Sequence, residues 1–205
     1  MTPSLPGSRA ASHALPRQVG TLILGVALLT LAAKIEIPFW PVPMTLHTLA
    51  IMGFAVFLGP RPALSIIAAY LALGAVGLPV FSGTPARGIG LAYMLGPTGG
   101  YLAGYPLGAL IAGHLAALLA RRPGWGWKMG GRLIAMLAGM VPVYGLGLLW
   151  LARFVPAGRV WALGAAPFLL GDLVKIAVLA AASGFFPALP FGASKGASAG
   201  TEDAR

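Results

Sequence analysis

Two charged residues, Asp172 and Lys175, lie inside a long apolar stretch near the end of the sequence. Their three-residue spacing places both side chains on one face of an α-helix. Asp172 comes about 11 residues after Trp161, a depth of roughly 16 Å and close to the middle of a bilayer. An ionisable group at that depth is costly unless it is paired, so we interpret the two residues as a binding site for a polar ligand. A purely structural ion pair is the alternative.

Composition places these two residues in a membrane protein. Hydrophobic residues make up 58% of the 205 positions and charged residues 9%, with a mean hydropathy of +0.87. Soluble domains carry about 25% charged residues. The net charge is +10, but the Lys and Arg residues are scattered between apolar stretches and form no single stripe, so no nucleic-acid partner is expected. The sequence has no cysteine, which excludes thiolate catalysis and cysteine-bound metals.

The apolar stretches predict an all-α integral membrane protein with six transmembrane helices. The predicted spans are 19–35, 44–58, 63–80, 98–120, 133–151 and 161–186. Residues 1–18 are then a cytoplasmic N-terminal segment, 19–187 a six-helix membrane domain and 188–205 a flexible cytoplasmic tail. A cleaved signal peptide is disfavoured, because Lys34, Glu36 and the prolines after them make a poor cleavage site.

The distribution of Lys and Arg predicts that both termini lie in the cytoplasm (N-in, C-in). Nine of these residues then fall inside, namely Arg9, Arg17, Arg61, Arg121, Arg122, Lys128, Arg132, Lys195 and Arg205. Four fall outside, namely Lys34, Arg87, Arg153 and Arg159. This orientation places the two Gly/Pro-rich segments, 36–43 and 81–97, on the outer face, where they are long enough to cover a site.

The first of these segments contains three prolines and cannot be regular helix. We expect it to dip into the protein before the second span begins, because irregular backbone is tolerated in a membrane only where protein buries it. Thr45 and His47 follow it. A single histidine at this place is either a hydrogen-bonded bundle residue or a ligand-binding residue.

The second segment leads into a glycine-rich helix start. Thr98 is expected to cap the fourth span, and Gly99 and Gly100 allow close approach of either a neighbouring helix or a ligand. Gly104 and Gly108 continue a GxxxG surface typical of helix packing. Three aromatic residues near the outer boundary are either ordinary interfacial residues or a sandwich for a flat ligand: Trp40, Phe81 and Tyr93.

The sequence offers no catalytic motif in a suitable context: residues 192–196 match GxSxG but lack the strand–turn–helix setting of a nucleophile. There is no GxxxxGK[ST] phosphate loop, so nucleotide hydrolysis, if it is needed, must come from another chain. There is also no HExxH motif and no paired-carboxylate motif. We therefore expect neither an enzyme nor a bound metal or cofactor.

Five segments together resemble the BioY family, the biotin-binding S components of energy-coupling-factor (ECF) transporters. The resemblance runs from about residue 20 to 187, through Pro41–Leu49, Leu58–Arg61, Gly74–Phe81, Leu95–Tyr101 and Gly171–Lys175. It implies an S-component fold with an outward-facing biotin site. It also implies a multi-pass protein of the cell membrane, the inner membrane if the source is bacterial.

The resemblance further implies roles for particular residues. Asp172 and Lys175 match the acidic-x-x-Lys motif that binds the polar groups of biotin, and Arg87 is the cation available for its carboxylate. Further candidate ligand-binding residues are Trp40, Thr45, His47, Phe81, Tyr93, Thr98, Gly99 and Gly100. Biotin is then the transported substrate, and no cofactor is implied.

The implied partners are a membrane coupling subunit and two ATPase subunits, in addition to the membrane lipid. The coupling subunit docks through the first span, for which Gly25, Leu29 and Ala33 are the candidate contact residues. Some members of the family are proposed to work without these partners. Two alternatives remain: a stand-alone proton-coupled vitamin transporter with Asp172 as the proton carrier, and a non-transporting membrane scaffold.

Overall fold

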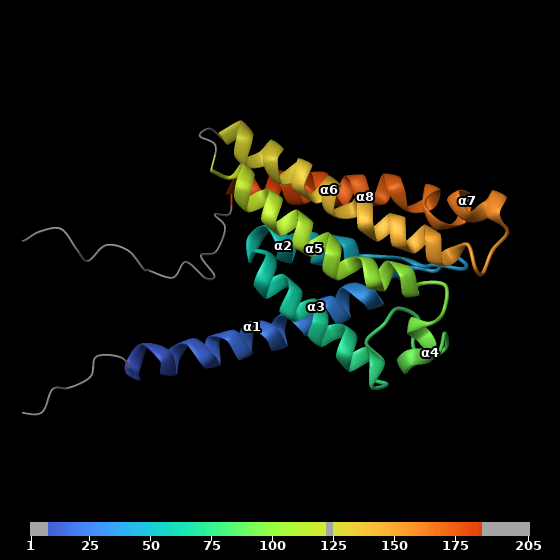
Figure 1. The fold of residues 1–205 in the computed structure, drawn as a ribbon, viewed down its shortest axis with the longest axis horizontal. Coiled ribbons are helices and arrows are strands. Elements are labelled where there is room, and N and C mark those ends of the chain that lie inside the picture. The colour runs from blue at the N-terminus through green and yellow to red at the C-terminus, as the bar shows by residue number, and fades with distance from the viewer. Residues whose placement is uncertain (1–7, 122–124, 186–205) are drawn as a thin grey trace, which may run out of the picture.

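The computed structural model describes residues 8–121 and 125–185, so the predicted tail at 188–205 lies outside the described residues. The fold is mostly helical (Figure 1). In chain order the helices are α1 (Ser8–Lys34), α2 (His47–Phe57), α3 (Pro60–Ala75), α4 (Gly90–Met94), α5 (Gly99–Leu119), α6 (Trp125–Leu151), η1 (Ala157–Arg159), α7 (Val160–Gly164) and α8 (Ala166–Phe185). Each of the six predicted apolar spans overlaps one of the longer helices.

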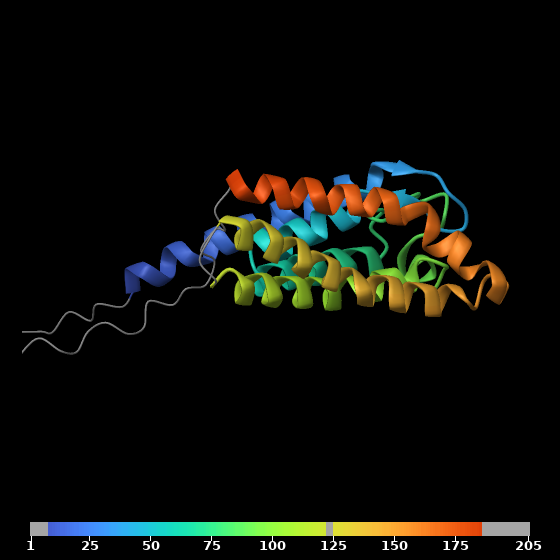
Figure 2. The ribbon, with the colours of Figure 1, turned by 90° about the horizontal axis from the view of Figure 1, so that it is seen from above.

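The longer helices run roughly along one axis of the molecule and pack side by side (Figures 1 and 2). Helix α5 packs most extensively on α6 and also contacts α2 and α3, whereas α8 lies on α6 and α2. Helix α1 begins and α8 ends at one end of the bundle. The short helices α4 and α7 lie at the other end, where the segments that connect the longer helices are also longest.

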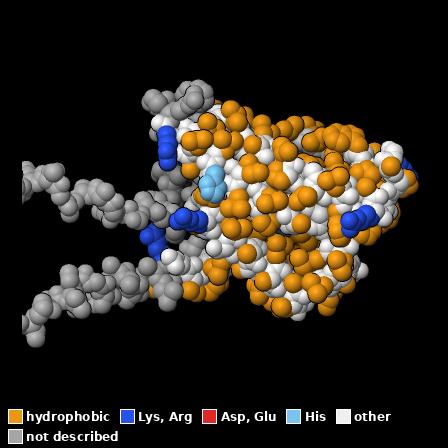
Figure 3. Space-filling view, in the orientation of Figure 1, with side chains coloured by type: hydrophobic (Ala, Val, Ile, Leu, Met, Phe, Trp, Pro, Cys, Tyr) orange, Lys and Arg blue, Asp and Glu red, His pale blue; other side chains and the backbone are white. Residues whose placement is uncertain are grey.

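Within residues 8–121 and 125–185, four stretches of helix are long and apolar enough to cross a membrane: Pro16–Lys34, Gly99–Leu119, Met129–Leu151 and Ala157–Ser183. Helices α2 and α3, with 11 and 16 residues, are shorter. The surface between the two ends of the bundle is largely apolar, and Lys and Arg side chains gather toward the ends (Figure 3). This distribution is typical of a protein whose middle is surrounded by lipid.

The segment after α1 departs from a purely helical fold. Strand β1 (Glu36–Ile37) pairs antiparallel with β2 (Met44–Thr45), with Glu36 opposite Thr45 and Ile37 opposite Met44. The pairing closes residues 38–43 into a hairpin-like loop. The segment is non-helical, as predicted, and Pro41, Val42 and Pro43 are buried in it.

Several predicted boundaries are wrong. Helix α1 begins 11 residues before the predicted start at residue 19, and it continues through Pro16. Helix α3 ends at Ala75, five residues before the predicted end at Val80, because Gly77 adopts a left-handed backbone (φ +100°) and Pro79 follows. The predicted loop 81–97 contains α4.

Two further corrections concern the last spans. Helix α6 begins at Trp125 instead of Leu133, so Arg132 lies inside a helix and not in a basic loop. Arg132 is buried, and its Nη1 donates to the Ser183 carbonyl oxygen at 2.5 Å. The last predicted span, 161–186, is divided at Ala165 into α7 and α8, and Pro167 occupies the first turn of α8, where its missing N–H leaves no helical bond unmade.

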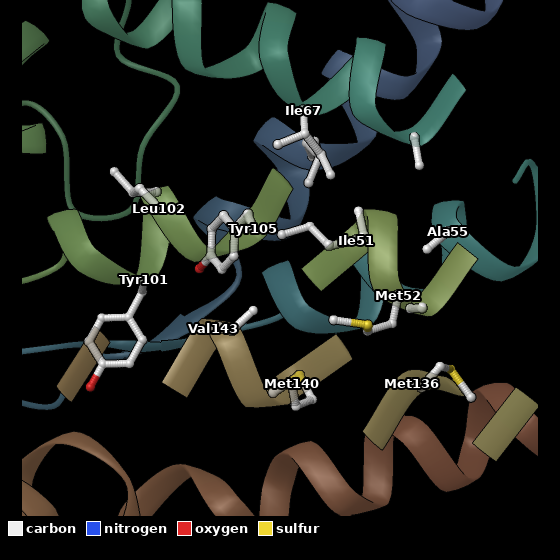
Figure 4. Packing of buried hydrophobic residues seen from close by; sticks show 14 of the residues in the cluster. Ile51, Met52, Ala55, Ile67, Tyr101, Leu102, Tyr105, Met136, Met140 and Val143 are labelled. Carbon is white, nitrogen blue, oxygen red and sulfur yellow. The ribbon is translucent and has the colours of Figure 1, made fainter. Parts of the chain in front are cut away.

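Close contact between α5 and α6 forms the middle of the core. A Cβ atom added at Gly104 would lie 2.7 Å from the Cα of Val143, and one added at Gly108 would lie 2.6 Å from the Gly139 carbonyl oxygen. The glycines therefore allow the two backbones to approach closely, as the GxxxG pattern predicts. Figure 4 shows side chains of α2, α3, α5 and α6 meeting around this contact, among them Met52, Ile67, Tyr105 and Met140.

Candidate functional site

A cavity lies at the meeting point of α2, α5, α6 and α8 with the segment before α2. Its volume is about 60 Å³. Its lining combines the Asp172–Lys175 pair with hydroxyl groups and aromatic rings. The lining residues are Val42, Pro43, Met44, Thr45, His47, Thr48, Ser82, Tyr93, Thr98, Tyr101, Leu102, Tyr105, Val143, Tyr144, Phe168, Asp172 and Lys175.

The two charged residues form a buried ion pair. Lys175 Nζ lies 2.9 Å from Asp172 Oδ1, and both side chains are about nine-tenths buried. Lys175 Nζ also donates to the Thr45 carbonyl oxygen at 2.6 Å. This last bond ties α8 to the segment before α2, and it satisfies a cation that would otherwise be very costly to bury.

Two hydroxyl groups complete the surroundings of the carboxylate. Thr48 Oγ1 on α2 donates to Asp172 Oδ1 at 2.7 Å, and Tyr144 Oη on α6 donates to Oδ2 at 2.7 Å. Three elements thus fix the orientation of one carboxylate. A carboxylate held in this way is a pre-organised acceptor for the N–H groups of a neutral ligand.

His47 lies at the floor of the cavity and is almost fully buried. Its Nδ1 lies 3.1 Å from Thr45 Oγ1 and its Nε2 lies 2.7 Å from Tyr70 Oη on α3. Both ring nitrogens are therefore engaged within the protein. The geometry agrees with the interpretation of His47 as a hydrogen-bonded bundle residue, although the ring also lines the cavity.

The predicted aromatic residues occupy different positions. Tyr93 lines the cavity, and burial raises the pKa of its phenol, so the hydroxyl stays protonated. Phe81 is fully buried and stacks on Tyr93, with the ring centroids 4.8 Å apart. Trp40 is 75% exposed and does not line the cavity. Phe39, its neighbour, packs edge-on against the cavity residue Phe168 instead.

Of the remaining predicted residues, Thr98 lines the cavity, whereas Gly99, Gly100 and Arg87 do not. Thr98 occupies the N-cap position of α5 but makes no capping side-chain bond, and it lines the cavity. Gly99 and Gly100 pack against Trp150 and the carbonyl oxygens of Met94 and Leu146, so these glycines allow close packing with α4 and α6. Arg87 lies outside the cavity lining and donates from Nη2 to the Phe39 carbonyl oxygen at 3.2 Å, which joins the two outer segments.

Of the candidate partner residues on α1, Leu29 and Ala33 are packed inside the bundle, whereas Gly25 contacts α3 and also lines an apolar groove between α1 and α2. Leu29 and Ala33 are fully buried, and a Cβ atom added at Gly25 would overlap the side chain of Ile66 on α3. The partner contact of the three residues stays a prediction. The outward side of α1 carries Leu24, Leu28 and Leu31, which line an apolar groove between α1 and α2.

Several cavity residues are missing from the sequence-based prediction. Tyr101, Tyr105 and Tyr144 come from apolar spans. Thr48 and Ser82 directly follow the predicted residues His47 and Phe81 in the sequence. A tyrosine in a membrane span is itself a signal, because a buried phenol requires a hydrogen-bond partner. Their convergence on one cavity depends on the helix packing.

Comparison with known proteins identifies the family to which this chain is similar. The sequence model of the BioY family matches residues 7–189. A relative from Pyrococcus horikoshii, named probable biotin transporter BioY, is 37% identical over 161 residues, which cover 78% of this chain and 90% of the relative. The biotin transporter BioY of Thermotoga maritima is 36% identical over 155 residues, covering 75% of this chain and 86% of the relative.

A solved structure has the same fold. The chain is similar to the crystal structure of the S-component for biotin from an ECF-type ABC transporter, with a TM-score of 0.70 and 26% sequence identity. The match covers 84% of this chain and 92% of the other. The similarity thus includes nearly all of the helical bundle.

Proposed function

This chain belongs to the BioY family, and on that premise we propose that it captures biotin and serves as the substrate-binding S component of an ECF-type transporter. The observation that carries the proposal is the buried Asp172–Lys175 pair, which opens onto a cavity lined by hydroxyl and aromatic side chains. Such a site suits a small ligand with one polar, planar end and an apolar body.

The chemistry of biotin fits these groups. Its ureido ring is neutral and carries two N–H donors and one carbonyl acceptor. Asp172 accepts a ureido N–H, Lys175 donates to the ureido oxygen, and the rings of Tyr101, Tyr105 and Phe168 cover the apolar part. Arg87 remains the predicted partner of the carboxylate, which requires its side chain to release the Phe39 carbonyl oxygen.

The volume of the cavity implies motion during capture. Drug-sized ligands occupy pockets of about 300–1,000 Å³, whereas this cavity measures about 60 Å³. Binding therefore requires the segments over the cavity to move outward. The hairpin at residues 36–45 and the segment that contains Ser82 are the elements positioned to do so.

We further propose that the chain crosses the cell membrane six times, with both termini in the cytoplasm. In a bacterium with two membranes, this is the inner membrane. The shared location of the start of α1 and the end of α8 at one end of the bundle supports an even number of crossings (Figure 1). The excess of Lys and Arg in the predicted inner segments supports this orientation. The cavity then opens toward the outer face.

Energy for transport is proposed to come from partner chains, a membrane coupling subunit and two ATPase subunits. The missing phosphate-loop motif supports this division of work. The apolar groove between α1 and α2 is the proposed place for the coupling subunit. Gly25 lines this groove together with Leu24, Leu28 and Phe54, so these residues are the proposed contacts.

A proton-coupled transporter without partners is less well supported. A proton carrier must gain and lose a proton in each cycle. Asp172 accepts hydrogen bonds from Thr48, Tyr144 and Lys175, so donors on three helices hold its carboxylate in one position. The geometry therefore favours a fixed acceptor for a ligand over a proton carrier.

Binding of biotin to the purified protein tests the proposal. Replacing Asp172 with Asn or Lys175 with Ala removes one charge-assisted hydrogen bond and leaves the other charge unpaired, so we expect the Kd to rise about 100-fold or more. Titration calorimetry measures the change. His114→Asn, a change at an exposed position on α5, serves as the control and should keep the wild-type Kd. Wild-type affinity in both site variants would refute the two assigned roles.

A further inference from the structure

A chain of hydrogen bonds connects the ion pair with the segment Val80–Thr84, which we call the cover segment. It begins at Lys175, which donates to the Thr45 carbonyl oxygen. From Thr45 it continues through its Oγ1 to His47 Nδ1 at 3.1 Å, and from His47 Nε2 to Tyr70 Oη at 2.7 Å. It ends where Tyr70 Oη donates to the Val80 carbonyl oxygen at 3.2 Å. The chain therefore joins α8, α2, α3 and the cover segment.

The positions of the protons follow from the groups at each end. Tyr70 has one hydroxyl proton, which it donates to Val80, so its oxygen accepts from the Nε2–H of His47. Nδ1 of a neutral imidazole is then an acceptor, and the Thr45 hydroxyl is the donor beside it. A second buried cation close to Lys175 would be costly, which favours the neutral ring. Every polar atom in the chain thus has a partner of the right kind.

The cover segment depends on this chain for its place over the cavity. Ser82 in the segment lines the cavity, and its hydroxyl donates to the Glu36 carboxylate. The Phe81 ring packs edge-on against Tyr70, with centroids 5.4 Å apart, and leaves no room for a Cβ atom at Gly74. Tyr70 on α3 therefore contacts the cover segment twice, through its ring and through its hydroxyl.

The outer side of the cover segment is fastened separately. Lys34 Nζ at the end of α1 donates to the Phe81 carbonyl oxygen at 2.9 Å and to Thr84 Oγ1 at 2.8 Å. These bonds join the segment to α1 but have no connection with the ion pair. Two routes among the described residues lead from the cover segment to Thr45 beside the ion pair. One runs through Tyr70 and His47, and the other runs from Ser82 to Glu36, which pairs with Thr45 in the two-stranded sheet.

We propose that His47 and Tyr70 are positioning residues. They hold the cover segment closed over the cavity, at a fixed position relative to the Asp172–Lys175 pair. This inference rests on the proposed function, because the ligand that the segment retains is biotin. Loss of the bond from Tyr70 to Val80 leaves the residues that line the cavity unchanged, because Tyr70 is not one of them, but lets the segment open more often. Ligand escape then becomes faster, while ligand entry is not slowed.

Two substitutions at His47 separate the positioning role from a general packing role. The amide of glutamine reaches the place of Nε2, so His47→Gln keeps the bond to Tyr70. The shorter asparagine reaches only the place of Nδ1, so His47→Asn keeps the Thr45 bond and loses the one to Tyr70. Tyr70→Phe keeps the ring and removes only the hydroxyl. His114→Gln and His114→Asn are the matched controls on the exposed face of α5.

The dissociation rate of labelled biotin is the first measurement. One neutral hydrogen bond corresponds to a change of about 2- to 12-fold, so we expect His47→Asn and Tyr70→Phe to speed dissociation about fivefold. Both His114 variants should stay within about twofold of wild type, and His47→Gln should dissociate more slowly than His47→Asn. Faster dissociation in His47→Gln equal to that in His47→Asn would overturn the proposal, as would an unchanged rate in a folded Tyr70→Phe protein.

Hydrogen–deuterium exchange of residues 80–88 without ligand is the second measurement. Backbone N–H groups in this range bond locally, for example from Arg87 to the Gly83 carbonyl oxygen at 2.9 Å. Their exchange should be faster in His47→Asn and Tyr70→Phe and unchanged in His47→Gln. If the wild-type protein binds no biotin but the variants show this exchange pattern, the proposed function fails and the positioning role stands. If wild type binds biotin and no variant alters the exchange, the positioning role alone fails.

Discussion

Asp172 keeps part of its hydrogen-bonding capacity open toward the cavity. An ionised carboxylate offers about four acceptor positions. Thr48 and Lys175 donate to Oδ1 and Tyr144 donates to Oδ2, so the open position is on Oδ2. A ligand N–H is therefore expected to bind beside the Tyr144 hydroxyl. The arrangement requires no movement of the ion pair, which makes the pair a fixed reference for the ligand.

The ion pair can be tested for a structural role separately from binding. Replacing buried ion pairs with apolar residues of similar size is often neutral or stabilising, whereas removing one partner is strongly destabilising. We expect Asp172→Leu alone to lower the thermal midpoint in detergent, and the double variant Asp172→Leu with Lys175→Met to restore most of it. Both proteins should fail to bind biotin. A double variant that is as unstable as the single one would indicate that the pair is mainly structural.

Helices α5 and α6 form the element that fixes the wall of the cavity. Tyr101, Leu102 and Tyr105 reach the cavity from α5, and Val143 and Tyr144 reach it from α6. The glycines between the two helices set their separation. Because both helices contribute to the lining, a change in their distance is expected to alter the cavity directly.

A matched pair of glycine substitutions tests this packing. At Gly104 a methyl group would meet the backbone of Val143 and Pro142, which cannot yield easily. We expect Gly104→Ala to destabilise the protein by about 1–3 kcal/mol through overpacking. Gly145 on α6 is exposed and has nothing within 4 Å of an added Cβ atom, so Gly145→Ala should leave stability equal or higher. Thermal unfolding in one detergent compares the two, and equal midpoints would contradict the close contact.

The described part of the molecule combines an apolar surface, charged ends and a buried polar site around Asp172 and Lys175. The surface between the ends carries no acidic side chain in the view of Figure 3, whereas the interior holds the Asp172–Lys175 pair. The outward residues of α1 and α2 line a broad apolar groove. A bundle of this kind binds a ligand but contains no phosphate-loop motif with which to use ATP.

Uptake of labelled biotin tests the division of work between chains. In cells without their own biotin uptake, the chain alone should give little accumulation at low external biotin. Co-expression with an ECF coupling subunit and two ATPase subunits should raise uptake severalfold, and a Walker-motif variant of the ATPases should abolish that gain. Uptake by the chain alone that collapses with a protonophore would contradict the proposal and favour the proton-coupled alternative.

The amino-acid sequence alone determined the class of protein and the central pair of its site. Apolar runs of sufficient length, few charges and the positions of Lys and Arg depend only on local composition. Asp172 and Lys175 were identifiable because charge inside an apolar span is costly, and because a three-residue spacing fixes their relation on a helix. The same local argument predicted that residues 36–43 are not helical.

Only the tertiary structure decided which distant residues meet this pair. Thr48 and Tyr144 lie 124 and 28 residues from Asp172 in sequence, and Tyr70 lies 23 residues from His47. Whether such side chains converge depends on how each helix is rotated and where it crosses its neighbours, which hydrophobic periodicity does not specify. For the same reason Phe81 is packed in the core, Gly25 faces α3, and Trp40 points away from the cavity that Phe39 helps to close.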